Sequence, residues 1–245
     1  MQTPELLPIE KEETFHFACH GKVPCFNLCC RDLNQALTPF DVLCLKNYLK
    51  VSSREFIQTY AVMYTGPSTG LPVVSLRFGN DQEKRCPFVT SGGCSVYAAR
   101  PSSCRIYPLA RALRRDRSDG RVSEHFAVVR EPHCRGFEQQ GAQTVGEWVA
   151  DQGLETYLAM NDTLMELIAQ KNQLRPGPLS AEHERWTRMA LYDIEALRER
   201  ALAGKLPCMN GDRPLPPPSE NEDDAWLQWG LRWINRVLFG ERRCI

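Results

Sequence analysis

The composition lacks any excess of charge and any long apolar run. The 245 residues carry 30 basic and 30 acidic side chains, so the formal net charge is zero. A chain with balanced charge shows no sign of nucleic-acid binding or of a strongly acidic partner. No segment reaches the roughly 20 consecutive apolar residues that a membrane-spanning helix needs. We therefore expect neither a membrane span nor a nucleic-acid partner.

The first residues lack the features of a secretion signal. The segment MQTPELLPIEKEETFHF has no basic start, no apolar run of signal length and no small-residue cleavage site. This predicts a cytoplasmic protein, and in the cytoplasm thiols are kept reduced.

Recognisable catalytic motifs are also lacking. We find no convincing nucleophile–base pair, no carboxylate dyad and no phosphate-binding loop. In particular, no G-x-G-x-x-G follows a predicted strand, where it would hold a nucleotide-like methyl donor. Any catalysis would therefore have to come from a metal centre.

Cysteine, in contrast, is abundant. The chain has eleven cysteines, concentrated in the segments FACHGKVPCFNLCC (17–30) and CPFVTSGGCSVYAARPSSC (86–104). Clustered thiols in a reducing compartment are more often metal ligands than disulfides. An odd number of cysteines leaves at least one thiol unpaired, and the neighbours Cys29 and Cys30 can bridge each other only with backbone distortion.

Zinc ions and iron–sulfur clusters need several cysteines held at one point. Eight thiolates suffice for two four-coordinate ions or for more than one cluster arrangement, and the sequence does not choose between zinc and iron. Adjacent cysteines in an extended segment point in opposite directions, so Cys29 and Cys30 are able to serve two different centres. The predicted metal ligands are Cys19, Cys25, Cys29, Cys30, Cys86, Cys94, Cys104 and Cys134.

Other side chains lie next to these ligands in the sequence. His20 and His133 are interpreted as exposed or hydrogen-bonding neighbours, with direct metal binding as the alternative. Arg100 and Arg105 flank Cys104, where they either offset the thiolate charge or are ordinary surface arginines. The remaining neighbours, which we expect to pack over the cluster, are Tyr97 and Tyr107.

Three cysteines are not assigned to metal. Cys44 lies one turn after Phe40 on a predicted helix, which indicates a buried core thiol. Cys208 and Cys244 are interpreted as incidental free thiols in a linker and at the C-terminus.

Capping signals and apolar spacing predict an α+β protein that is mainly helical. A loop-rich cysteine-cluster module is expected at 1–140 and a helical region at 141–245, with a proline-rich linker at 205–224. Thr38 and Asp41 form a capping box with Pro39 at the first helical position. Predicted strands lie at 72–78 and 125–131, and predicted helices at 39–49, 52–60, 144–170, 181–203 and 225–239.

Two further segments have unusual composition. Residues 105–121 hold six arginines and two acids, which indicates a solvated loop or, alternatively, a surface for an acidic partner or RNA. Trp226, Trp229 and Trp233 form a stripe on the last predicted helix, which we expect to dock onto the C-terminal core.

Several short motifs occur together in a fixed order. They are F-x-C…C-x3-C-C at 17–30, L-T-P-x-D at 37–41, E-F at 55–56, C-P-F at 86–88, G-C-S-V-Y at 93–97 and A-R-P-x-x-C-R-x-Y-P at 99–108. In this combination the chain resembles the CxxCxxCC family of zinc- or iron-chelating, YkgJ-like cysteine-cluster proteins. The first cysteine spacing is longer than the C-x2-C-x2-C-C usual in that family.

The resemblance implies a metal-binding protein, with zinc or iron, including an iron–sulfur cluster, as its cofactor. One branch of the family is described as flagellin lysine N-methylase. That branch implies, as an alternative, a protein-lysine N-methyltransferase with a protein substrate. A metal carrier that passes its ion to a protein partner is the third hypothesis.

Overall fold

The computed structural model describes residues 3–80, 82–116, 118–207, 215–218 and 222–240. They fall into two compact units, which we call the cysteine unit (1–33 and 78–156) and the helical unit (34–77 and 157–245). The fold is α+β and mainly helical, as predicted. Among the described helices, none has the length and apolar character needed to cross a bilayer. The division into a cysteine-cluster metal-binding module at 1–140 and a helical region at 141–245 stays a prediction.

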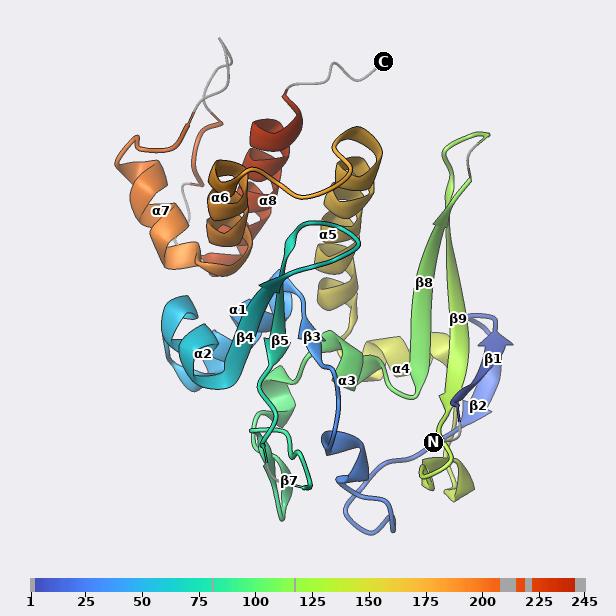
Figure 1. Ribbon diagram of the computed structural model, residues 1–245. Coiled ribbons are helices and arrows are strands. Elements are labelled where there is room, and N and C mark those ends of the chain that lie inside the picture. Colours follow the sequence, from blue (N-terminus) through green and yellow to red (C-terminus); the bar gives the residue numbers. More distant parts are fainter. Residues whose placement is uncertain (1–2, 81, 117, 208–214, 219–221, 241–245) are drawn as a thin grey trace. The chain divides into compact units, whose positions relative to one another are not determined.

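The cysteine unit contains a three-stranded antiparallel sheet (Figure 1). The central strand, β9 (Val122–Arg130), pairs with β1 (Glu5–Ile9) on one side and with β8 (Leu109–Arg115) on the other. The predicted strand at 125–131 is thus confirmed as β9, which begins three residues earlier, at Val122. The prediction of a loop at 105–121 is wrong, because Leu109–Arg115 form a strand of the β8–β9 hairpin, with Arg114 and Arg115 exposed.

Smaller elements complete the cysteine unit. Strand β2 (Thr14–His16) pairs with β10 (Ala142–Thr144), and β6 (Val89–Thr90) pairs with β7 (Gly93–Cys94). Three 3-10 turns accompany them. The 3-10 turns are Leu28–Cys30, Tyr97–Ala99 and Gly136–Glu138. The two short helices are α3 (Ser102–Ile106) and α4 (Val145–Asp151).

The helical unit begins with the predicted capped helices. Helix α1 (Pro39–Leu49) has the complete Thr38–Asp41 capping box, and α2 (Ser53–Tyr60) is capped by Ser52. The sheet of this unit has the order β3-β5-β4, with β3 at Ala36–Leu37, β4 at Ala61–Thr65 and β5 at Pro72–Leu76. The predicted helices and the strand at 72–78 are thus confirmed, with small shifts in their ends.

Two long predicted helices are each divided in two. The prediction at 144–170 becomes α4 and α5 (Glu155–Leu174), because Gly153 adopts a φ of +58° that ends the first helix. The prediction at 181–203 becomes α6 (Ala181–Tyr192) and α7 (Ile194–Leu202). Asp193 leaves the helical conformation there, and its side chain accepts the Ala196 amide to cap the second helix.

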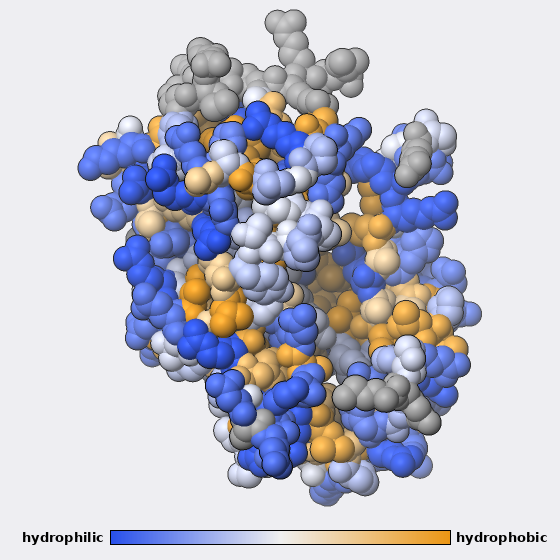
Figure 2. All heavy atoms as spheres, viewed as in Figure 1, coloured by the Kyte–Doolittle hydropathy of each residue, from blue (hydrophilic) through white to orange (hydrophobic). Residues whose placement is uncertain are grey.

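The last helix, α8 (Asp223–Phe239), is the centre of the helical unit. It packs against α1, α6 and α7, and its stripe of Trp226, Trp229 and Trp233 is buried, as predicted. The predicted linker at 205–224 lies partly outside the described residues. On the face shown in Figure 2, hydrophobic residues reach the surface in separate patches among a mainly hydrophilic exterior.

The close approach of α8 to α6 predicts an effect of Gly230→Ala. A methyl group at this position would lie 2.9 Å from the Ala190 carbonyl oxygen and 2.7 Å from Leu197 Cδ2. The backbone oxygen can yield only if α6 shifts, so overpacking should outweigh the better helix propensity of alanine. We expect a loss of about 1–2 kcal/mol in urea unfolding. Gly146→Ala is the control, since its methyl group would have contacts of 3.9 Å; equal stability of the two variants would contradict the prediction.

Candidate metal centre

The two cysteine-rich segments meet through their backbones in the cysteine unit. The Cys86 amide donates to the Cys30 carbonyl at 2.9 Å, and the Asp32 amide donates to the Lys84 carbonyl at 3.0 Å. Between these two bonds, Arg31 and Arg85 form an antiparallel bridge. The pairing brings the end of the first segment against the start of the second, although more than fifty positions separate them in the chain.

Cys19, Cys25 and Cys134 form one set of neighbouring thiols, which we call the Cys25 group. Cys25 is buried, and its sulfur accepts the backbone N–H of Arg135 at 3.1 Å. The Cys134 thiol interacts with Cys25 as a hydrogen-bond neighbour. Burial, together with the charges of Cys29, Cys25 and Cys134, raises the pKa of the Cys19 thiol to about 11. Two separate parts of the chain, the first cysteine-rich segment and the turn at Cys134, thus contribute neighbouring thiols.

Cys29, Cys30, Cys86 and Cys94 form a second set, which we call the Cys86 group. The β6–β7 hairpin pairs Cys94 with Val89 and thereby returns the chain toward Cys86. Burial raises the pKa of the Cys86 thiol, while hydrogen bonds from the backbone amides of Phe88 and Val89 act in the opposite direction. Amides that point at a sulfur in this way stabilise its thiolate form, which is the form that binds metals.

Cys29 connects the two groups. A hydrogen bond with Cys30, and then burial, raise the pKa of its thiol above the ordinary range. Its charge also acts on Cys19 in the Cys25 group and on Cys86 and Cys94. The two groups are therefore adjacent parts of one thiol-rich region.

Cys104 lies at the edge of this region, exposed on α3, with Arg100 nearby. Arg100 is only 8% exposed, and its guanidinium donates to the Tyr97 carbonyl at 3.0 Å and to the Gln152 side chain. Burial lowers the pKa of this guanidinium, whereas the charges of Tyr97, Cys104 and Cys94 favour its charged form. A buried cation beside thiols fits the charge-offset interpretation better than that of a surface arginine.

Arg105 continues the same network. It donates to the Arg100 carbonyl at 3.0 Å and to the Gln152 carbonyl at 2.8 Å. The two arginines thus tie the start of α3 to the end of α4.

The buried position of Arg100 predicts a stability loss in Arg100→Met. The variant leaves the Tyr97 carbonyl and the Gln152 side chain without their charged donor, and hydrogen bonds to charged groups contribute about 1.5–3 kcal/mol. We expect a loss of about 2 kcal/mol in chemical unfolding. Arg114→Met, on the exposed side of β8, should stay close to the wild type; a similar loss there would point to a general effect of removing positive charge.

The two tyrosines differ from each other. The prediction that Tyr97 packs over the cluster is wrong: it is 60% exposed and stacks under the Arg100 guanidinium, 3.8 Å from its ring centroid. Tyr107 does pack beside the thiols. Burial and the neighbouring Cys134 raise the pKa of its phenol.

An aromatic cluster that the sequence analysis missed lies beside the Cys25 group, which it meets through Tyr107 and Cys134. The ring of Phe17 contacts Tyr107, Phe137 and Trp148 at centroid distances of 5.1–5.9 Å. Phe17 precedes Cys19 by two residues and Phe137 follows Cys134 by three. In the sequence, an aromatic residue close to each of these two cysteines was the available signal. Only the fold shows that the two aromatic rings contact each other.

The two histidines contact other residues than the cysteines beside them in the chain. His20 is exposed and accepts the Lys22 amide at 3.3 Å, while His133 faces Glu131 at 3.6 Å. Cys44 is only partly buried, so the core-thiol prediction holds in part. No disulfide forms among the nine described cysteines, and Cys208 and Cys244 lie outside the described residues.

The thiols are neighbours without converging on one point. Within the described part of the chain, no three His, Cys, Asp or Glu side chains come together as a formed metal site would require. The donor set nevertheless fits a thiolate-binding metal, since amide donors and a buried arginine surround the sulfurs. The assignment of the eight cysteines as ligands stays a prediction.

Comparison with known proteins gives one match. The model of a family described as "CxxCxxCC: Putative zinc- or iron-chelating domain" matches residues 18–135. This range contains all eight predicted ligands and, apart from Phe17, every motif on which the sequence resemblance depends. No curated protein and no solved structure matches the chain.

Proposed function

Because residues 18–135 belong to the CxxCxxCC family of zinc- or iron-chelating domains, we propose that this protein holds zinc or iron through the thiolates of its two cysteine-rich segments. One observation carries the proposal: the backbone pairing of Cys30 with Cys86 joins the two segments where their thiols are densest. Thiolate-binding metals need this arrangement, in which distant parts of a chain supply ligands at one place.

The proposed ligands divide between the two groups. The Cys25 group supplies three thiols and the Cys86 group four, with Cys104 at the edge of the second group. We assign one centre to each group, with Cys29 or Cys30 as the residue that completes the smaller one. The Arg135 amide and the Arg100 guanidinium offset the negative charge that thiolates bring to the metal. When bound, the metal supplies folding free energy and, with an open position, acts as a Lewis acid.

The experiment that tests the proposal is anaerobic purification followed by elemental analysis and an absorption spectrum. We expect zinc or iron in stoichiometric amount; a broad visible band would identify an iron–sulfur centre, and a colourless protein with zinc would identify a zinc site. In Cys86→Ser/Cys94→Ser, at least half of the metal should be lost. Cys44→Ser, which changes a thiol of the helical unit, should retain all of it. A metal-free but fully folded wild type would refute the proposal.

We propose a cytoplasmic location, since clustered thiols that bind a metal are kept reduced in that compartment. The alternatives of a metal carrier and of a protein-lysine N-methyltransferase would use the same thiols, and no observation favours either over metal binding itself. They differ in their tests. A carrier surrenders its metal quickly to a competing chelator, whereas a methyltransferase binds its methyl donor in a calorimetric titration.

A further inference from the structure

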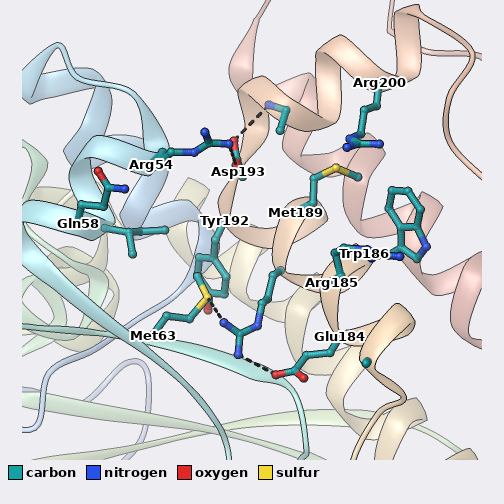
Figure 3. Close-up of a pocket in the computed structure, with 14 residues that line it drawn as sticks. Arg54, Gln58, Met63, Glu184, Arg185, Trp186, Met189, Tyr192, Asp193 and Arg200 are labelled. Carbon is teal, nitrogen blue, oxygen red and sulfur yellow. Dashed lines mark hydrogen bonds and ion pairs between the residues drawn. The ribbon is translucent and has the colours of Figure 1, made fainter.

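The helical unit contains a cavity that metal binding does not explain. Its volume is about 650 Å³, and its lining comes from α2, β4, α6 and α7, all within that unit (Figure 3). The floor is apolar, with the buried side chains of Met189 and Tyr192 and the partly buried Met63. The size lies within the range of ligand-binding pockets.

The rim of the cavity is positively charged. Six charged residues line it, four of them arginines: Arg54, Arg185, Arg188, Arg200, Glu184 and Asp193. The two acids are already engaged. Glu184 accepts from Arg188 at 2.7 Å and from Thr65 at 2.8 Å, and these bonds lower the pKa of its carboxyl. Asp193 pairs with Arg54 at 3.5 Å and also caps α7. Two positive charges are thus in excess at the rim.

That excess resides on Arg185 and Arg200. Their guanidinium carbons lie 5.5 Å and 5.7 Å from the same ring, that of Trp186, and within the described residues neither arginine has an acidic partner. Stacking on an indole restrains a guanidinium while leaving its N–H donors free to bind an anion. The guanidinium groups of the two arginines are therefore pre-oriented to bind carboxylate or phosphate groups.

From these observations we propose that the cavity binds an acidic peptide segment of a partner protein. Carboxylates of the segment pair with Arg185 and Arg200, and an apolar side chain between them contacts Met63 and Met189. The two excess cations lie on different helices, Arg185 on α6 and Arg200 on α7, which suits two carboxylates spaced along an extended chain. Methionines on the floor suit a variable apolar side chain, since they adapt their shape.

The binding test uses the full-length protein and a fluorescein-labelled ten-residue peptide in which glutamates alternate with leucines. Fluorescence anisotropy should show saturable binding that weakens as salt is raised. The same peptide with lysine in place of glutamate should bind at least tenfold more weakly. Failure of the acidic peptide to bind at millimolar protein, or equal binding of both peptides, would overturn the proposal.

Variants locate the site. Arg185→Glu/Arg200→Glu should weaken binding of the acidic peptide by at least tenfold. Arg175→Glu/Arg232→Glu makes the same charge change at exposed positions of the helical unit outside the cavity, and should bind within twofold of the wild type. Ala196→Trp fills the cavity without changing its charge and should also weaken binding. Circular dichroism establishes that each variant is folded. If both charge-reversed variants lose affinity equally, or if phenyl phosphate binds at this cavity and the peptide does not, the assignment is wrong.

Discussion

Removal of the metal is expected to unfold much of the cysteine unit and to spare the helical unit. The region around the thiols consists of 3-10 turns, two-residue strands and the five-residue helix α3, so little regular backbone hydrogen bonding holds it together. Isolated elements of this size are marginally stable in water. Structural zinc contributes about 10–16 kcal/mol of apparent binding free energy in small metal domains, which is also folding free energy. Loss of the metal should therefore remove several kcal/mol of stability from this unit.

Hydrogen exchange measures this effect unit by unit. After anaerobic chelation, the amides of Cys86 and of the β6–β7 hairpin should lose protection, whereas amides in the middle of α8 should keep theirs. The control is the same chelator saturated with calcium. Unchanged protection around Cys86 in protein shown to be metal-free would mean that the thiols do not depend on a metal for their arrangement.

Replacement of Lys46 by methionine should produce the second large effect. Lys46 is 5% exposed, and its Nζ lies 2.6 Å from Asp223 Oδ2 and 3.2 Å from Glu195 Oε1. It thereby ties α1 to α7 and α8. The variant leaves two partly buried carboxylates without this cation, with Arg198 as the remaining partner of Asp223. We expect a loss of about 2–3 kcal/mol, below the 3–5 kcal/mol for breaking a fully buried pair.

The pH dependence distinguishes this ion pair from simple packing. Burial raises the pKa of Asp223 and Glu195, but hydrogen bonds and the Lys46 charge outweigh it, so both pKa values lie below their ordinary range. In the unfolded chain these carboxyl groups have pKa values of about 4. In acid the unfolded chain therefore binds more protons than the folded protein does. The stabilisation is complete above about pH 4 and disappears as the pH falls through the lower, folded-state values.

The difference in unfolding free energy between the wild type and Lys46→Met, measured by chemical unfolding, should accordingly decrease below about pH 4. Lys205→Met, at an exposed position, should differ little from the wild type at any pH. If the difference in unfolding free energy stays constant from pH 7 to pH 3, the loss comes from packing of the aliphatic part of Lys46 and not from its ion pairs.

The sequence predicted well what local chemistry determines. The Thr38–Asp41 capping box forms as predicted, because a cap needs only residues within one turn. The burial of Trp226, Trp229 and Trp233 followed from helical periodicity in the same way. The two cysteine-rich segments were recognised from spacing and composition alone.

The sequence did not predict features that depend on the backbone conformation of a single residue or on partners distant in the chain. Gly153 ends α4 by adopting a positive φ, and Asp193 divides α6 from α7, although apolar spacing continues across both points. Strand β1 has no clear alternation and exists because β9 offers its edge. The Arg185–Trp186–Arg200 cluster joins α6 to α7, which had been predicted as one helix.

The backbone bond between Asp32 and Lys84 has a consequence for chain topology. The segment 34–77, which is one of the two parts of the helical unit, leaves and re-enters the cysteine unit at positions that this bond joins. Closing a loop of about 50 residues costs conformational entropy that grows only with the logarithm of its length. An inorganic centre shared by thiols on both sides of this junction would act as a cross-link on the denatured chain. It would restrict the unfolded ensemble much as a disulfide does, but reversibly and under the control of metal supply.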